Sequence, residues 1–78
     1  MNNTTNKPDT AAKKEYYGMT EFMEVIYKLS FSQGFYGRLY CDLLNWKEND
    51  PDYFLELTYQ VEAARLTSDL DVIFWLET

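Results

Sequence analysis

Histidine is absent from this chain of 78 residues, and cysteine occurs once, at Cys41. The first absence removes the commonest general base and the commonest metal ligand of proteins. A single cysteine excludes an intramolecular disulfide and a zinc site built from cysteines. Because Cys41 has no histidine partner, we expect it to be a small core residue rather than a nucleophile. We therefore expect no catalytic residue, no metal site, no cofactor and no enzymatic activity.

Long apolar runs and positive charge are also scarce. No stretch approaches the roughly 20 apolar residues of a membrane span, and residues 1–14 lack the apolar core of a signal peptide. With the scarcity of cysteine, this indicates a cytoplasmic protein. The net charge is −6, and residues 19–78 hold four bases against eleven acids. Such a field repels phosphate backbones and anionic lipids, so we expect neither direct nucleic-acid binding nor a membrane partner.

Hydrophobic residues are plentiful, at 46% of the chain, and aromatic residues alone make up 18%. Large rings can build a core in a short chain, and a wholly disordered chain would lack them. Residues 1–18 are polar and show no apolar period, which predicts a flexible tail. For residues 19–78 we predict a single all-α domain, a compact bundle of three to four short helices.

Two helices are predicted in the first half of that domain. One starts at Thr20 as its N-cap and ends near Phe31. The next starts after Ser32 as its N-cap and ends near Trp46. Because this second segment is apolar over a wide arc, we expect it to be the central helix. The apolar face of the first helix consists of Phe22, Val25, Ile26 and Leu29.

Two further helices are predicted in the second half. Asp50 as N-cap and Pro51 at the first position open one of them, after a loop at residues 47–49. Ser68 with Asp71 resembles a capping box that opens the last element. Residues 70–76 are also rich in strand formers, but a lone strand would lack a partner, so a helix is favoured. The residues expected to face inward from it are Leu70, Ile73 and Phe74.

A distinctive run at residues 32–38 reads Ser-Gln-Gly-Phe-Tyr-Gly-Arg. One interpretation is a small-anion site at a helix start, formed by Ser32, Gly34 and Arg38. The interpretation that we favour is close packing, in which Gly34 and Gly37 let the first helix cross tightly over the second.

Acidic and aromatic residues concentrate around the predicted start of the third helix. Aromatic residues are enriched at protein interfaces, and acids beside them would suit a partner protein with a basic surface. The alternative is that the aromatic residues complete the core while the acids cap a helix. The candidate partner-binding residues are Trp46, Glu48, Asp50, Asp52, Tyr53 and Glu56.

Residues 32–39, followed by an acidic helix and the closing segment 69–77, resemble small uncharacterised acidic proteins encoded on phages and conjugative elements of gut bacteria. The resemblance covers residues 20–78. It implies a bacterial or phage setting and an accessory role, such as an inhibitor or a regulator. It implies no activity, site or cofactor.

The leading hypothesis is thus a non-catalytic protein-binding module that uses an acidic–aromatic surface. One alternative is a structural homo-oligomer without a separate ligand site, because the chain has more large aromatic residues than so small a core can cover, and a homodimer would bury the excess. The other alternative is a small-anion binder at residues 32–38.

Overall fold

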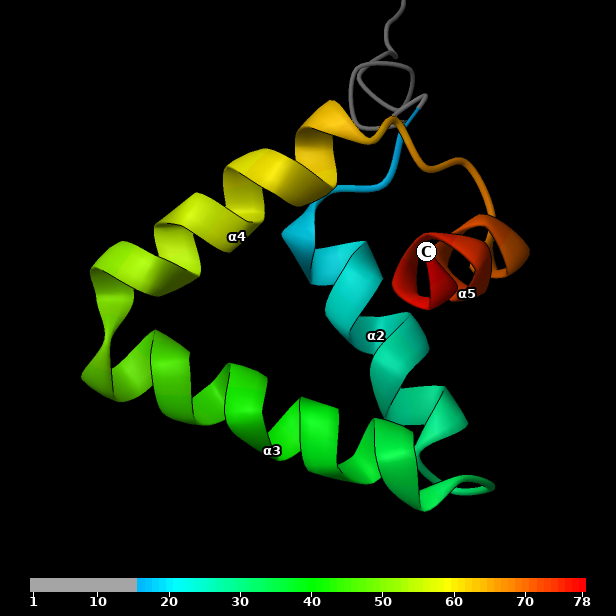
Figure 1. Ribbon diagram of the computed structural model, residues 1–78, viewed down its shortest axis with the longest axis horizontal. Coiled ribbons are helices and arrows are strands. Elements are labelled where there is room, and N and C mark those ends of the chain that lie inside the picture. The colour runs from blue at the N-terminus through cyan, green and yellow to red at the C-terminus, as the bar shows by residue number, and fades with distance from the viewer. Residues whose placement is uncertain (1–15) are drawn as a thin grey trace, which may run out of the picture.

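The computed structural model describes residues 16–78, which form four helices: α2 (Met19–Leu29), α3 (Gly34–Asn49), α4 (Pro51–Ala63) and α5 (Asp69–Glu77). Helices α2, α3 and α4 form the sides of a triangle, and α5 lies against α2 on its other side (Figure 1). The predicted all-α fold is confirmed. Residues 70–76 are helical, as favoured from the sequence.

The central helix is α2, which contacts each of the other three. Its apolar face supplies Met19, Phe22, Val25 and Ile26 to the core. The expectation that the second helix is central was wrong, because α3 buries only Tyr36 and Leu43. The other apolar side chains of α3 are half-buried or exposed.

Two helix starts differ from the prediction. The N-cap of α2 is Gly18 rather than Thr20, because the Gly18 N–H donates to Glu21 Oε1 at 2.8 Å and so forms half of a capping box. The N-cap of α3 is Gln33 rather than Ser32. The Ser32 hydroxyl donates instead to the Leu29 carbonyl at 3.2 Å, where it satisfies the end of α2.

A single residue, Asp50, joins α3 to α4. Its N–H donates to the Trp46 carbonyl at 2.8 Å, and its own carbonyl accepts from the Phe54 N–H at 3.0 Å. The predicted loop at residues 47–49 was wrong, since these residues form the last turn of α3. Asp50 is the N-cap of α4 and Pro51 its first residue, as predicted, although the Asp50 side chain makes no capping hydrogen bond.

The last helix begins as predicted but faces another way. Ser68 Oγ accepts from the Asp71 N–H at 3.1 Å. Leu70 and Phe74, which were expected to face inward, are exposed, whereas Val72 is fully buried. Trp75 packs beside Val72 and meets the Phe22 ring edge-to-face at 5.6 Å. Because α5 has nine residues and its six apolar residues point to all sides of the helix, its sequence does not reveal which side is buried.

The link between α4 and α5 holds the first described residues. The Tyr17 N–H donates to the Leu66 carbonyl at 2.6 Å, and Leu66 is buried. Arg65, just before it, has a left-handed backbone with φ 55°. The predicted tail at residues 1–18 lies outside the described residues except for its last three, which contact the helical body.

None of the helices within residues 16–78 has the length and apolar character needed to cross a membrane.

Candidate partner-binding surface

The corner between α3 and α4 brings together the residues that the sequence proposed for partner binding. Trp46 on the last turns of α3 and Tyr53 on the first turn of α4 meet across Asp50. Their ring centroids lie 4.9 Å apart at an interplanar angle of 79°, an edge-to-face contact. Trp46 is half-buried and packs against the core, whereas Tyr53 is 45% exposed. The pair therefore has one ring anchored in the fold and one facing solvent.

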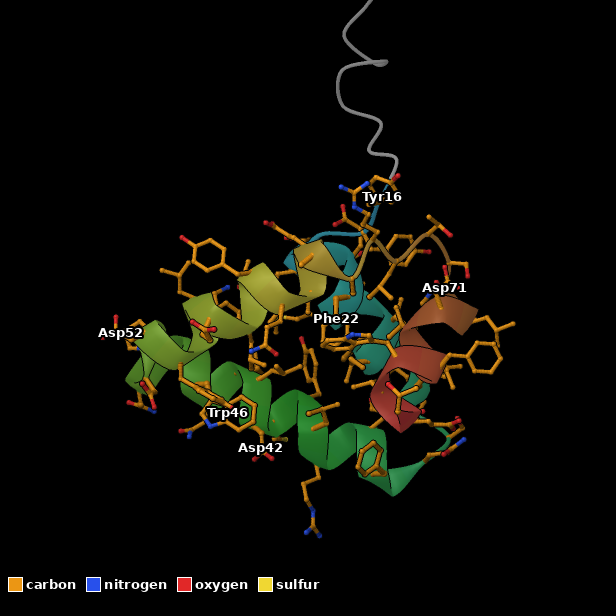
Figure 2. All side chains as sticks on the ribbon, turned by 45° about the horizontal axis from the view of Figure 1, so that its top comes forward. Tyr16, Phe22, Asp42, Trp46, Asp52 and Asp71 are labelled. Atoms are coloured by element: carbon orange, nitrogen blue, oxygen red, sulfur yellow. The ribbon has the colours of Figure 1, made fainter. Side chains whose placement is uncertain are left out.

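Four acidic residues lie close to this pair in the sequence, and all four are exposed: Glu48, Asp50, Asp52 and Glu56. Figure 2 shows Asp52 at the outer end of the corner and Trp46 on the adjoining helix. Within the described part of the chain, none of these carboxylates forms a salt bridge. Residues 42–62 carry six acids and one lysine, a net charge of −5. We call Trp46, Tyr53 and these four carboxylates the acidic–aromatic corner.

The three residues proposed for an anion site lie at the start of α3 and in the turn before it. The Ser32 hydroxyl is engaged by the end of α2, as described above. Gly34 and Arg38 are exposed on the first turns of α3. The close-packing interpretation of the glycines was wrong. A Cβ added at Gly34 would meet nothing within 4 Å, and one at Gly37 would make only ordinary contact with Ser30, at 3.8 Å.

Cys41 is exposed rather than buried in the core, which corrects the prediction. It lies on α3 between the half-buried Tyr40 and the exposed Asp42, away from the side that carries Leu43 into the core. No group of three or more potential metal ligands occurs among residues 16–78.

A polar network that the sequence did not predict ties the start of the described chain to α5. Tyr17 Oη donates to Asp69 Oδ1 at 2.9 Å, and Lys28 Nζ donates to Asp69 Oδ2 at 3.0 Å. The hydrogen bonds from Lys28 and Tyr17 lower the pKa of Asp69 below its ordinary value of 3.8. The same bonds raise the pKa of Lys28 and the pKa of Tyr17. Because the network is exposed, solvent screens its charges and it contributes only modestly to stability.

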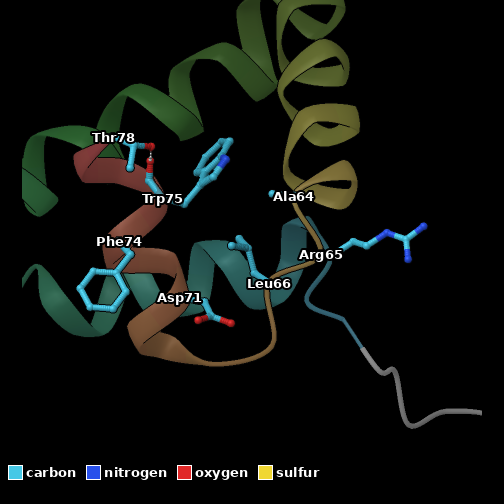
Figure 3. A pocket seen from close by; sticks show the side chains of 7 residues that line it. All are labelled: Ala64, Arg65, Leu66, Asp71, Phe74, Trp75 and Thr78. Atoms are coloured by element: carbon cyan, nitrogen blue, oxygen red, sulfur yellow. Dashed lines mark hydrogen bonds between the residues drawn. The ribbon is translucent and has the colours of Figure 1, made fainter.

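A shallow depression of about 370 Å³ lies beside α5 and the α4–α5 link (Figure 3). Its two charged residues, Arg65 and Asp71, are already engaged. The Arg65 guanidinium lies over the Tyr16 ring, 5.4 Å from its centroid. Asp71 accepts from the Thr67 N–H at 3.0 Å and from the Thr67 hydroxyl at 2.7 Å, and these bonds lower its pKa. This depression therefore offers a ligand little charge that is not already paired.

Comparison with protein-family models, curated protein sequences and solved structures gives no match. The role implied by the resemblance to proteins of mobile elements therefore stays a prediction. The geometry of the chain itself is the basis for the function proposed below.

Proposed function

We propose that the protein is a non-catalytic protein-binding module whose acidic–aromatic corner docks onto a basic surface of another protein. The observation that carries this proposal is the partly exposed Trp46–Tyr53 ring pair, which lies in a stretch of chain with four exposed acidic residues. An aromatic ring held by its neighbour buries a large area on binding and loses little conformational freedom.

Charge supports the choice of partner. The net charge of −5 over residues 42–62 accelerates encounter with a basic surface and opposes acidic ones. Because the carboxylates lie at the surface, they would contribute mainly to the association rate and to specificity. The Tyr53 ring would then supply the short-range apolar contact. An inhibitor or regulator encoded on a mobile element, the role implied by the resemblance above, would act through such a contact.

A comparison of two tyrosines on one helix tests the aromatic part of this proposal. Tyr53 and Tyr59 both lie on α4, at 45% and 60% exposure, but only Tyr53 contacts Trp46. Proteins captured on the immobilised chain would be identified, purified and titrated against both variants by calorimetry. We expect Tyr53→Ala to weaken binding about tenfold or more, and Tyr59→Ala to leave the affinity within about twofold.

A matched pair of charge variants tests the electrostatic part. Glu56→Gln removes one charge at the corner, and Glu77→Gln removes one exposed charge at the end of α5, outside residues 42–62. We expect the first to slow association and to flatten its dependence on salt, and the second to do neither. The proposal fails if both tyrosine variants weaken binding equally, or if affinity for the purified partner does not fall as salt rises.

A further inference from the structure

The large apolar side chain with the highest exposed fraction among the described residues lies in the turn just after α2. Phe31 is 75% exposed, and its ring meets Tyr27 edge-to-face, with centroids 5.0 Å apart. The Tyr27 ring in turn lies 5.2 Å from that of Tyr40 on α3. These three rings form a continuous aromatic strip from the end of α2 across to α3.

The strip runs into a depression of about 240 Å³ between α2 and α3. Tyr27 and Tyr40, two residues of the strip, also line the depression, and Met23 lines it beside them. An apolar cavity of about 150 Å³ is enough to hold a benzene molecule. The depression can therefore accept a phenyl ring, and the exposed phenyl ring of Phe31 lies next to it.

Electrostatics indicate which molecule can approach this face. Residues 19–41, which include α2 and the first half of α3, carry two acids and two bases and have no net charge. Residues 42–62 carry −5, so two copies of the chain repel each other at the acidic–aromatic corner. The depression is itself lined by one acid, Glu24, and one base, Lys47. A face that carries both signs lets a second copy, related by a two-fold axis, approach without the like-charge repulsion expected at the corner.

We propose that two copies of this chain form a symmetric dimer through the α2–α3 face, with Phe31 of each copy seated in the depression of the other. The arrangement is reciprocal, as a two-fold interface requires, and it covers the aromatic strip of both copies. The dimer would use a different face from the acidic–aromatic corner, so its presence or absence leaves the proposed function untouched.

The test is the oligomeric state of the full chain, measured by sedimentation equilibrium over about a hundredfold range of concentration. Two substitutions that leave the net charge unchanged are compared at exposed phenylalanines. Phe31→Gln changes the proposed interface, and Phe74→Gln, on α5, is the control. Because both side chains are mostly exposed, both variants keep the fold, which circular dichroism checks. The wild type is also measured at low and high salt.

We expect a monomer–dimer equilibrium in the wild type. Phe31→Gln should raise the dissociation constant about thirtyfold, which is about 2 kcal/mol at 1.4 kcal/mol per factor of ten, whereas Phe74→Gln should leave it unchanged. Salt should strengthen the dimer because it screens the repulsion between two chains of charge −6. A chain that stays monomeric throughout would overturn the proposal. So would a dimer that Phe31→Gln does not weaken, or one that Phe74→Gln weakens equally.

Discussion

The orientation of α5 can be tested by truncating one buried and one exposed side chain on that helix. Val72 is fully buried, whereas Phe74, two residues later, is 57% exposed. Val72→Ala removes two methyl groups from the core, at about 0.8 kcal/mol each. A residual cavity of about 40 Å³ adds about 1 kcal/mol. Alanine returns about 0.5 kcal/mol as the better helix former, so the net loss of stability is about 2 kcal/mol.

Phe74→Ala removes a larger side chain, but more than half of that side chain is exposed, and the variant gains helix propensity in the same way. We expect a net effect of at most about 1 kcal/mol, about half of the loss at Val72. A domain of this size unfolds with about 3–9 kcal/mol, so the loss at Val72 is a large fraction of the total. It corresponds to a fall in Tm of about 8–16 °C.

Urea and thermal unfolding, followed by the helical circular dichroism signal, measure both variants against the wild type. If α5 faced the core with Leu70, Ile73 and Phe74, as the sequence suggested, Phe74→Ala would be the more damaging change. A Phe74→Ala variant as destabilised as Val72→Ala would therefore refute the packing described for α5.

Four further predictions follow from single features. Arg65 has a left-handed backbone with φ 55°, a conformation that costs a residue with a Cβ about 1 kcal/mol more than it costs glycine. Arg65→Gly and Arg65→Ala both lose the contact with Tyr16, so they differ only in this backbone cost. Thermal unfolding should therefore show the glycine variant about 1 kcal/mol more stable than the alanine variant. Ser68→Ala removes the cap of α5 and should cost about 1 kcal/mol in urea unfolding, with an unchanged m-value. Folding lowers the pKa of Asp69 and that of Asp71, so the stability that these carboxylates contribute is present above pH 3.8 and is lost as the pH falls through the lowered pKa values. The difference in unfolding free energy between wild type and Asp69→Asn should therefore be constant near neutral pH and shrink below about pH 4. A difference that grows in acid would contradict the network. Cys41 is exposed, so a thiol reagent should modify it completely in the folded protein at the rate seen in urea, and protection by folding would contradict its position.

The fold class and the helix positions could be predicted because local patterns determine them. The apolar spacing of α2 and the Asp50-Pro51 start of α4 depend only on neighbouring residues. The inward side of α5 could not be predicted, since a short helix that is apolar all round fits the core in several rotations. Cys41 was misplaced for a related reason: residue type favours burial, but the helix rotation decides it.

The candidate surface was predicted in composition but not in geometry. Trp46 and Tyr53 lie seven positions apart, and they meet because one residue joins two helices at the corner. The Tyr17–Asp69 hydrogen bond and the strip of Tyr27, Phe31 and Tyr40 have no local signal. Their residues come together only through tertiary packing. The excess of aromatic residues was the one hint of the strip in the sequence.

The junction at Asp50 has a consequence for how the corner would be recognised. With a single residue between the helices, and hydrogen bonds on both sides of it, the chain has no slack with which to change the angle between them. The backbone positions that carry the carboxylates are therefore held at fixed spacings before any encounter. A binder would meet a rigid template, whose ordering was completed during folding, and the free energy of association would not be spent on arranging it.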